Sequence, residues 1–261
     1  MNKKTIGTTI MCFFLAFALA SSGMLLDQYF DAKNSAETFD TLAEKVVDVT
    51  EPAVPNEVTT KATKEELALQ EAELAQEKYG ALFEHNQDFI GWISIDGTNV
   101  NYPVMQTPNN PDYYLKHSFE KSYSDYGVPY IDEACALGIS NNIVVYGHHM
   151  RNGSMFADIC KYTDKSFYKE HNTIKFDTIS TLGEYEIVAV FRFDTNNETF
   201  KFNEYTTMDE DEFNEFMENV RSRQLYDTGV DAEYGDELLT LSTCEYTYKN
   251  GRFVVVAKKV S

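Results

Sequence analysis

The chain has 261 residues, with 42 acidic and 22 basic side chains and a formal net charge of −20 at pH 7. This acidity argues against nucleic acid as a partner, because phosphate binding needs a basic surface. Aromatic residues make up 14% of the chain, which excludes a mostly disordered acidic tail, and the length suits one domain with a sizeable core.

The chain begins with a run that is long enough to cross a membrane. Lys3 and Lys4 precede an uncharged stretch over residues 5–26. This length spans a bilayer with some tilt, and the positive-inside rule keeps the lysines in the cytoplasm and puts Asp27 onward outside. The alternative is a cleaved signal peptide, with ALASS as the cleavage site, but the apolar run is long for a signal core. We predict a cytoplasmic stub and single-pass membrane anchor over residues 1–30, with the rest of the chain extracellular.

A linker and a helix are predicted next. Residues 31–62 are polar and acidic and contain two prolines, which is typical of a linker. Thr63 and Glu66 have the spacing of a capping box, and leucines give the following run an apolar side, so we predict a helix to about His85. The folded domain is predicted to extend from this helix over residues 63–261.

Short strands and turns dominate the sequence after this helix. The Asp96-Gly97 pair between two β-rich runs is typical of a hairpin turn. Further strands are predicted at residues 143–146 and in the segments TIKFDT and GEYEIVAVFRFD. Within residues 207–227, apolar side chains recur at helical spacing behind an acidic first turn. We therefore predict a mostly β domain, folded as a barrel, with one late helix inserted between strands.

One of the four cysteines ends a predicted strand. None forms a CxxC pair, which argues against a zinc site or a disulfide framework. Cys12 belongs to the apolar N-terminal run, so Cys135, Cys160 and Cys244 remain, and an odd number leaves at least one free thiol. Many cysteines are simply small buried hydrophobes. Cys244, however, ends strand 238–244 beside a polar loop, where a small buried side chain is less needed to fill the core.

Arg252 opens the following strand, and the turn between the two strands decides whether it meets Cys244. A tight turn through the Asn-Gly pair would set Cys244 opposite Ala257 and separate the two side chains. One wide loop over residues 245–251 would instead place them on either side of its mouth, facing one pocket. Local sequence leaves both forms open.

His148 follows a predicted strand and a glycine, where a side chain is exposed to a cleft. Taken alone it would be an ordinary loop histidine, just as Arg252 would be a surface arginine. Neighbours on a strand point to opposite faces, so only one of His148 and His149 is expected to face Cys244. A zinc site from both histidines and a cysteine matches no closed spacing. Together the three residue types suit amide-bond chemistry through a thioester, with a thiolate nucleophile, a histidine that moves the proton and an arginine that binds the oxyanion.

These segments resemble the signatures of the sortases, the cysteine transpeptidases of Gram-positive surfaces. TLSTC resembles the TLxTC signature, YGHHM carries the strand-end Gly-His and GRFVVVA carries the arginine strand, all in the family's order. GWISIDGTNVNYPVMQ, GHHMRNGSMFADI and the late helix resemble class B. The resemblance implies an eight-stranded sortase-type β-barrel with an N-terminal helix and a helix between strands 6 and 7. It also implies His148, Cys244 and Arg252 as the catalytic set, and it favours the wide loop.

The resemblance carries over less securely to the substrate groove. Ser242 and Leu115 resemble groove-lining residues of class B. Asn110 is a weaker match, because the Asn-Asn-Pro sequence shifts the spacing. The acidic calcium site of some class A enzymes has no counterpart here, so the resemblance implies no metal and no cofactor.

The implied activity is cleavage of a C-terminal sorting motif, of NPxTx or a related PxT type, after threonine. The acyl-enzyme is then passed to an amine of a cell-wall peptide, with hydrolysis as a side reaction, so that surface proteins carrying the signal are anchored. One alternative is a pilin-polymerising sortase, but residues 31–62 lack an aromatic lid motif. Another is a non-catalytic, membrane-anchored binding protein, which the intact His, Cys and Arg disfavour. A papain-like hydrolase would carry its cysteine before its histidine, on a helix.

Overall fold

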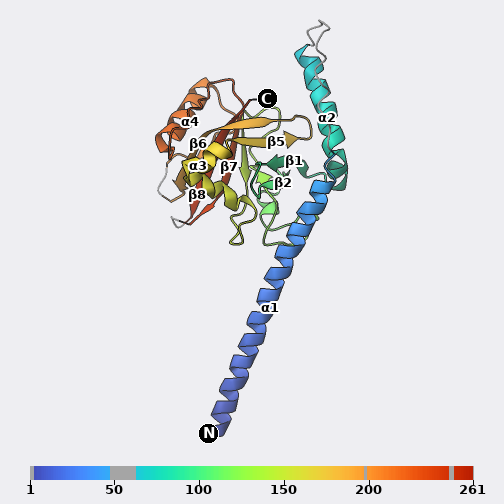
Figure 1. The fold of residues 1–261 in the computed structure, drawn as a ribbon, viewed down its shortest axis with the longest axis vertical. Helices are drawn as coiled ribbons and strands as arrows, with labels where there is room; N and C mark the ends of the chain where they lie inside the picture. The colour runs from blue at the N-terminus through green and yellow to red at the C-terminus, as the bar shows by residue number, and fades with distance from the viewer. Residues whose placement is uncertain (1–2, 48–62, 197–198, 247–249, 261) are drawn as a thin grey trace.

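The folded part of the chain is a closed β-barrel (Figure 1). The computed structural model describes residues 3–47, 63–196, 199–246 and 250–260. Around the barrel the strands follow the order β1-β2-β3-β4-β7-β8-β6-β5. Their bounds are β1 Phe89–Ser94, β2 Asn101–Met105, β3 Tyr130–Ile131, β4 Asn142–Tyr146, β5 Thr173–Thr178, β6 Glu184–Asp194, β7 Leu238–Glu245 and β8 Gly251–Lys259. The predicted mostly β, eight-stranded barrel is confirmed.

Helices flank the barrel and fill several of its connections. The α-helices are α1 Lys3–Glu44, α2 Lys64–His85, α3 Lys165–Glu170 and α4 Glu210–Arg223. Short 3-10 helices are η1 Tyr113–Leu115, η2 Phe156–Thr163 and η3 Phe202–Glu204. The predicted helix before the barrel and the predicted helix between β6 and β7 are both present.

The first two strands form the predicted hairpin. β1 and β2 pair antiparallel, with Ser94 opposite Asn101. Gly97 in the turn has φ +77°, a conformation that costs glycine little. On its other side β1 approaches β5 so closely that a Cβ on Gly91 would lie 2.1 Å from the Asp177 carbonyl oxygen. Glycine at this position lets the two backbones meet.

Strands β7 and β8 are buried along most of their length. β8 lies between β6 and β7, and its residues 253–257 are all buried. A strand covered on both faces is apolar without alternation, which explains the run FVVVA. β7 lies between β8 and β4, and it runs parallel to β4 and antiparallel to β8. The end of β7 is therefore supported from both sides.

Both predicted amphipathic helices begin with the signals seen in the sequence. Thr63 and Glu66 form a capping box at the start of α2. Asp209 and Glu212 form another at the start of α4, which covers β6 with one buried apolar side. The buried side chains of α4 are Phe213, Phe216, Met217 and Val220. The structure shortens the predicted helix 207–227 to the residues between its N-cap and Arg223.

The linker predicted over residues 31–62 is wrong for its first part. Helix α1 continues without a break to Glu44, and its last turns lie against the barrel (Figure 1). Phe39 and Leu42 are buried there, with Phe39 packed edge-on against Tyr102 of β2 at 5.0 Å between ring centroids. A few apolar residues at helical spacing are enough to bury one face of an otherwise acidic segment. Residues 48–62 lie outside the described part of the chain.

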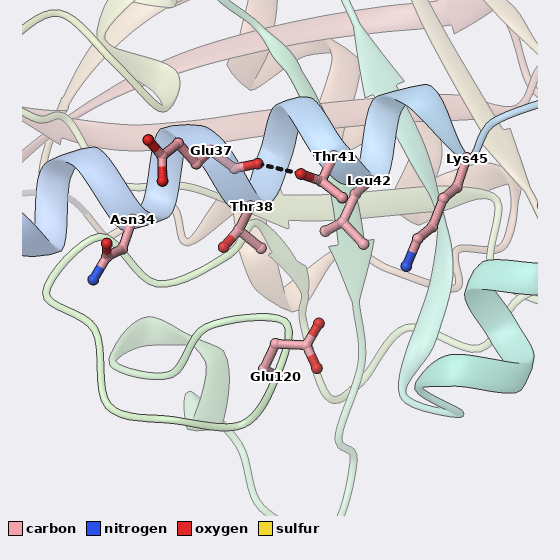
Figure 2. Close-up of a pocket in the computed structure, with 7 residues that line it drawn as sticks. All are labelled: Asn34, Glu37, Thr38, Thr41, Leu42, Lys45 and Glu120. Carbon is pink, nitrogen blue, oxygen red and sulfur yellow. Dashed lines mark hydrogen bonds between the residues drawn. The ribbon is translucent and has the colours of Figure 1, made fainter.

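Apart from this docked end, α1 extends away from the barrel (Figure 1). Among the described residues, one helix is long and apolar enough to cross a membrane, Phe13–Glu44, with a mean hydropathy of 1.3 in its apolar window. Figure 2 shows the docked end, where α1 and the facing loop line a polar pocket. The pocket is lined by Asn34, Glu37, Thr38, Thr41, Leu42, Lys45 and Glu120.

Candidate active site

Cys244 and Arg252 face each other across two paired strands. The β7–β8 register sets Cys244 opposite Arg252 and Glu245 opposite Gly251, so both side chains lie on one face of the sheet. The guanidinium Nη1 of Arg252 lies 3.6 Å from the sulfur of Cys244. An arginine stays charged at every physiological pH, so it can donate to a thiolate or to an oxyanion formed beside the sulfur.

This register decides between the two turns that the sequence left open. A tight Asn-Gly hairpin would set Cys244 opposite Ala257, whereas Ala257 pairs with Leu239. The strands are joined instead by the loop 246–250. This loop is shorter than the predicted loop 245–251, because Glu245 and Gly251 still pair with each other. Asn250 has φ +66°, in the left-handed region that asparagine tolerates. Residues 247–249 of this loop lie outside the described residues.

His148 lies at the same end of the barrel as Cys244. β4 and β7 are parallel, and Tyr146 lies opposite Ser242. His148 and Cys244 each come two residues later in the chain, so they lie at the same end of the two strands. Gly147 allows the turn at this point, because a Cβ there would lie 2.5 Å from the ring of Phe156. The structure therefore brings the three predicted catalytic residues to one edge of the barrel.

The ring of His148 is held by a main-chain carbonyl. Its Nε2 lies 2.7 Å from the carbonyl oxygen of Leu115. A carbonyl only accepts hydrogen bonds, so Nε2 carries a proton and Nδ1 is left to exchange one. Burial lowers the pKa of His148, the Leu115 hydrogen bond opposes this, Lys116 lowers the pKa further and Asp125 raises it.

His149 binds the backbone of Cys244. Its Nδ1 lies 3.0 Å from the carbonyl oxygen of Cys244 and 3.5 Å from the sulfur of Cys160. The Tyr246 hydroxyl donates to the His149 carbonyl at 3.0 Å, and the two rings are 5.0 Å apart. Since Nδ1 must donate to the carbonyl, His149 steadies the main chain at the end of β7.

The predicted substrate residues are placed unequally. Ser242 lies on the same face as Cys244, two residues before it on β7, and its buried hydroxyl makes no hydrogen bond within the described residues. Leu115 is 36% exposed and touches the site through the carbonyl that holds His148. Asn110 is exposed on the turn before η1, where its main chain bonds Thr107 and Tyr113.

Two tyrosines that the sequence analysis did not single out lie beside this site. Tyr146 pairs with Ser242, and its ring lies 5.5 Å from that of Tyr130 on β3. Their hydroxyls donate to Asp132 and Asp112 at 2.7 and 2.6 Å. Burial, the main cause, and these carboxylates raise the pKa of both phenols, so both stay protonated. The sequence signal that could have identified Tyr146 is its position directly before the Gly-His pair.

A half-buried ion pair supports Glu245, the residue after Cys244. Arg192 on β6 lies 3.6 Å from the carboxylate of Glu245, whose side chain is only 12% exposed. This contact ties the last residue of β7 to a strand on the far side of β8. Among the described residues, no group of three or more His, Cys, Asp and Glu side chains is arranged to hold a metal ion.

The comparisons with known proteins agree with this geometry. The family model described as "Sortase domain" matches residues 93–260, which is more than half of the chain. The chain belongs to the sortase family. The sortase B of Listeria monocytogenes is 34% identical over 179 residues, covering 67% of this chain and 71% of that protein. The sortase B of Staphylococcus aureus is 32% identical over 184 residues, covering 69% and 74%.

Solved structures identify the same branch of the family. The crystal structure of Clostridium perfringens sortase B matches with a TM-score of 0.64 at 32% identity, covering 70% of this chain and 99% of that one. A Staphylococcus aureus sortase B–substrate complex matches with a TM-score of 0.64 at 27% identity, covering 76% and 94%. This sortase is therefore a class B sortase, and its general activity is that of a cysteine transpeptidase.

Proposed function

We propose that this sortase cleaves a C-terminal sorting motif, of NPxTx or a related PxT type, after its threonine. In this proposal Cys244 is the nucleophile, His148 moves the proton and Arg252 binds the oxyanion. The observation that carries it is the cross-strand pair of Cys244 and Arg252, with 3.6 Å between sulfur and guanidinium. A cation beside the sulfur can stabilise both the thiolate before attack and the oxygen after it.

The first half-reaction forms a thioester. The thiolate of Cys244 attacks the threonine carbonyl carbon, the carbonyl oxygen becomes an oxyanion beside Arg252, and the C–N bond then breaks. The leaving amine takes a proton from His148, through Nδ1, because Nε2 is occupied by the Leu115 carbonyl. The thioester remains on Cys244 and the C-terminal part of the substrate departs.

The second half-reaction transfers the acyl group. An amine of a cell-wall peptide attacks the thioester carbon and loses its proton to His148, and the sulfur leaves as a thiolate. Where no amine is present, water takes its place and the product is a free carboxylate. Both routes return the enzyme to its starting state, so no cofactor is required.

We further propose that the substrate lies along the face of β4 and β7. The exposed side chain of Leu115 is suited to contact an extended peptide near Cys244, while Ser242 lies buried beneath this face, its hydroxyl unpaired among the described residues, and is proposed to shape its floor. Asn110 is proposed only as an outer contact, since it lies on an exposed turn. The Staphylococcus aureus relative has been solved as a sortase B–substrate complex, which supports substrate binding on this fold.

The apolar part of α1 is proposed to anchor this sortase in the cell membrane, with the N-terminus inside and the barrel outside. Its side chains between residues 13 and 30 are almost all exposed and largely apolar, which suits contact with lipid. The proposed partners are surface proteins with a sorting signal and an amine of the cell wall or its precursor.

The proposal is tested with fluorescent peptides that carry NPxTx and PxT variants, incubated with the full chain in detergent. We expect release of the C-terminal part, and a mixed amide product when a short amine-bearing peptide is added. A mass increase on Cys244 that matches the acyl part would identify the thioester. If no peptide in the panel is cut and no acyl group is found on Cys244, the proposed activity is excluded for these motifs.

A further inference from the structure

The membrane-proximal helix contacts the loop that holds His148. Asp31 on α1 accepts two hydrogen bonds, from the Ser124 hydroxyl at 2.9 Å and from the Asp125 main-chain N–H at 2.8 Å. Ser124 is only 3% exposed. These contacts join segments more than ninety residues apart. Hydrogen bonds to an ionised carboxylate are about twice as strong as neutral ones.

The same loop leads directly to the histidine. The Ser124 N–H donates to the Lys116 carbonyl at 3.0 Å, and the Lys116 ammonium lies 2.8 Å from the Asp125 carboxylate. The residue before Lys116 is Leu115, whose carbonyl accepts from His148 at 2.7 Å. Three hydrogen bonds, Asp31–Ser124, Ser124–Lys116 and Leu115–His148, therefore connect Asp31 to the histidine ring.

This loop has little room to adjust. Gly127 packs against the chain segment that carries the accepting carbonyl, and a Cβ there would lie 2.7 Å from the Leu115 oxygen. Gly127 itself has φ +58°, which suits glycine. The end of the loop that follows Asp125 is therefore packed directly against the Leu115 carbonyl, so that we expect a displacement of Ser124–Asp125 to reach this carbonyl.

A second contact of α1 reaches the segment on the other side of the histidine. Phe39 packs on Tyr102, whose hydroxyl accepts from the Met155 N–H at 2.9 Å. The next residue, Phe156, donates its N–H to the His148 carbonyl at 2.8 Å. Helix α1 thus supports both segments that fix the position of His148.

We propose that Asp31 is a positioning residue for the transpeptidation, holding the Ser124–Asp125 end of the loop so that the Leu115 carbonyl keeps the His148 ring in register with the thiol. This inference rests on the proposed role of His148. It assigns a part in the reaction to the helix that also carries the membrane anchor. A shift of about 1 Å in a catalytic group can cost up to about a hundredfold in rate, so a contact this far from the chemistry can matter.

The test uses the full chain in lipid nanodiscs, with Asp31→Ala, Asp31→Asn and the control Glu37→Gln. Glu37 is on the same helix and carries the same charge, but its ion pair is an exposed one with Lys33 at 3.5 Å. We expect Asp31→Ala to lower kcat about tenfold with KM for the sorting peptide changed less than about twofold. Asp31→Asn keeps one acceptor for the Asp125 N–H and is expected to lose about threefold. Glu37→Gln should match the unmodified enzyme.

Two further readouts separate positioning from general stability. The ring nitrogens of His148, followed by NMR in protein labelled with ¹⁵N-histidine, should shift in Asp31→Ala and stay unchanged in Glu37→Gln. Ser124→Ala and Asp31→Ala both remove the Ser124–Asp31 hydrogen bond, so the double variant should cost less than the product of the two single losses. The melting temperature of the barrel should stay within about 3 °C, as expected for the loss of one such contact.

The inference is overturned if Asp31→Ala leaves kcat unchanged, or if its loss of activity follows a loss of folded barrel. It is also overturned if the His148 ring signals do not move, and this result does not depend on any peptide being cut. If the unmodified chain cleaves no peptide, the proposed function fails, and the NMR comparison still decides whether Asp31 positions His148.

Discussion

The two sides of the active site are built in different ways. Cys244 on β7 and Arg252 on β8 are cross-strand neighbours, and the inner residues of both strands are buried. His148 lies just beyond the end of β4 and is held by the carbonyl of Leu115, which is 33 residues away in the chain. One side is fixed by strand register, and the other by hydrogen bonds between loops.

This difference separates what must be rigid from what can be adjusted. A strand register cannot slip by one residue without turning a whole buried face outward, so the distance between sulfur and guanidinium is set by the core. Loop contacts open locally at a much lower cost than the core. We therefore expect substitutions on the strand side to abolish the chemistry, and substitutions around His148 to tune it.

The largest effect is expected from Cys244→Ala on the strand side. Loss of the proposed nucleophile should reduce kcat/KM for a sorting peptide by at least about 10³-fold without unfolding the barrel. The control is Cys160→Ala, whose sulfur contacts His149 and not the proposed substrate face, and it should stay within about threefold. Equal activity of Cys244→Ala and the unmodified enzyme would remove Cys244 as nucleophile.

Arg252→Lys tests whether the cross-strand partner acts through its shape as well as its charge. Lysine keeps the charge but loses the planar fork, so we expect a loss in kcat of about 10²-fold. Arg221→Lys on α4 is the control, because Arg221 pairs with the exposed Asp231. If Arg252→Lys retained full activity, the arginine would act by charge alone.

The two adjacent histidines compare the sides directly. His148→Ala removes the proposed proton carrier, and we expect a loss of about 10²-fold in kcat. His149→Ala removes a hydrogen bond to the Cys244 carbonyl, worth about 1 kcal/mol, together with the ring contacts to Cys160 and Tyr246, and should cost about threefold to fivefold. Steady-state kinetics of both variants check this, and the reverse order would exchange their roles.

The smallest effect is expected from the charges around His148. Lys116 lowers its pKa and Asp125 raises it. Lys116→Gln should therefore raise the pKa of His148, and Asp125→Asn should lower it, which NMR titration of the imidazole ring measures. A shift of the same sign in both variants would contradict this arrangement of charges.

The stability of the fold should follow the same titration. Burial makes the folded-state pKa of His148 lower than the ordinary value of about 6.5, so the unfolded chain takes up the proton first as the pH falls. His148 therefore lowers stability progressively as the pH drops through 6.5 and stops doing so below its folded-state pKa. Urea unfolding of His148→Gln between pH 7 and 5 should show a weaker loss than the unmodified chain.

Much of the architecture followed from local patterns. The Asp96-Gly97 turn, the capping box at Thr63 and the helix behind Asp209 each depend on residues a few positions apart, and each was found where the pattern predicted it. The linker failed because its few apolar residues, Phe39 among them, carry too little signal in an acidic segment. Their burial depends on a barrel surface formed elsewhere in the chain.

The sequence alone determined the barrel, the late helix and the apolar N-terminal run, and it singled out the candidate catalytic residues, because periodicity and motifs are local properties. Only the tertiary structure decided the pairing of Cys244 with Arg252 against a competing Asn-Gly turn, since the register depends on the buried faces of β7 and β8. It alone revealed that Leu115 holds His148 and that Asp31 supports that loop. These contacts join residues 33 and 94 positions apart, and no local pattern encodes such distances.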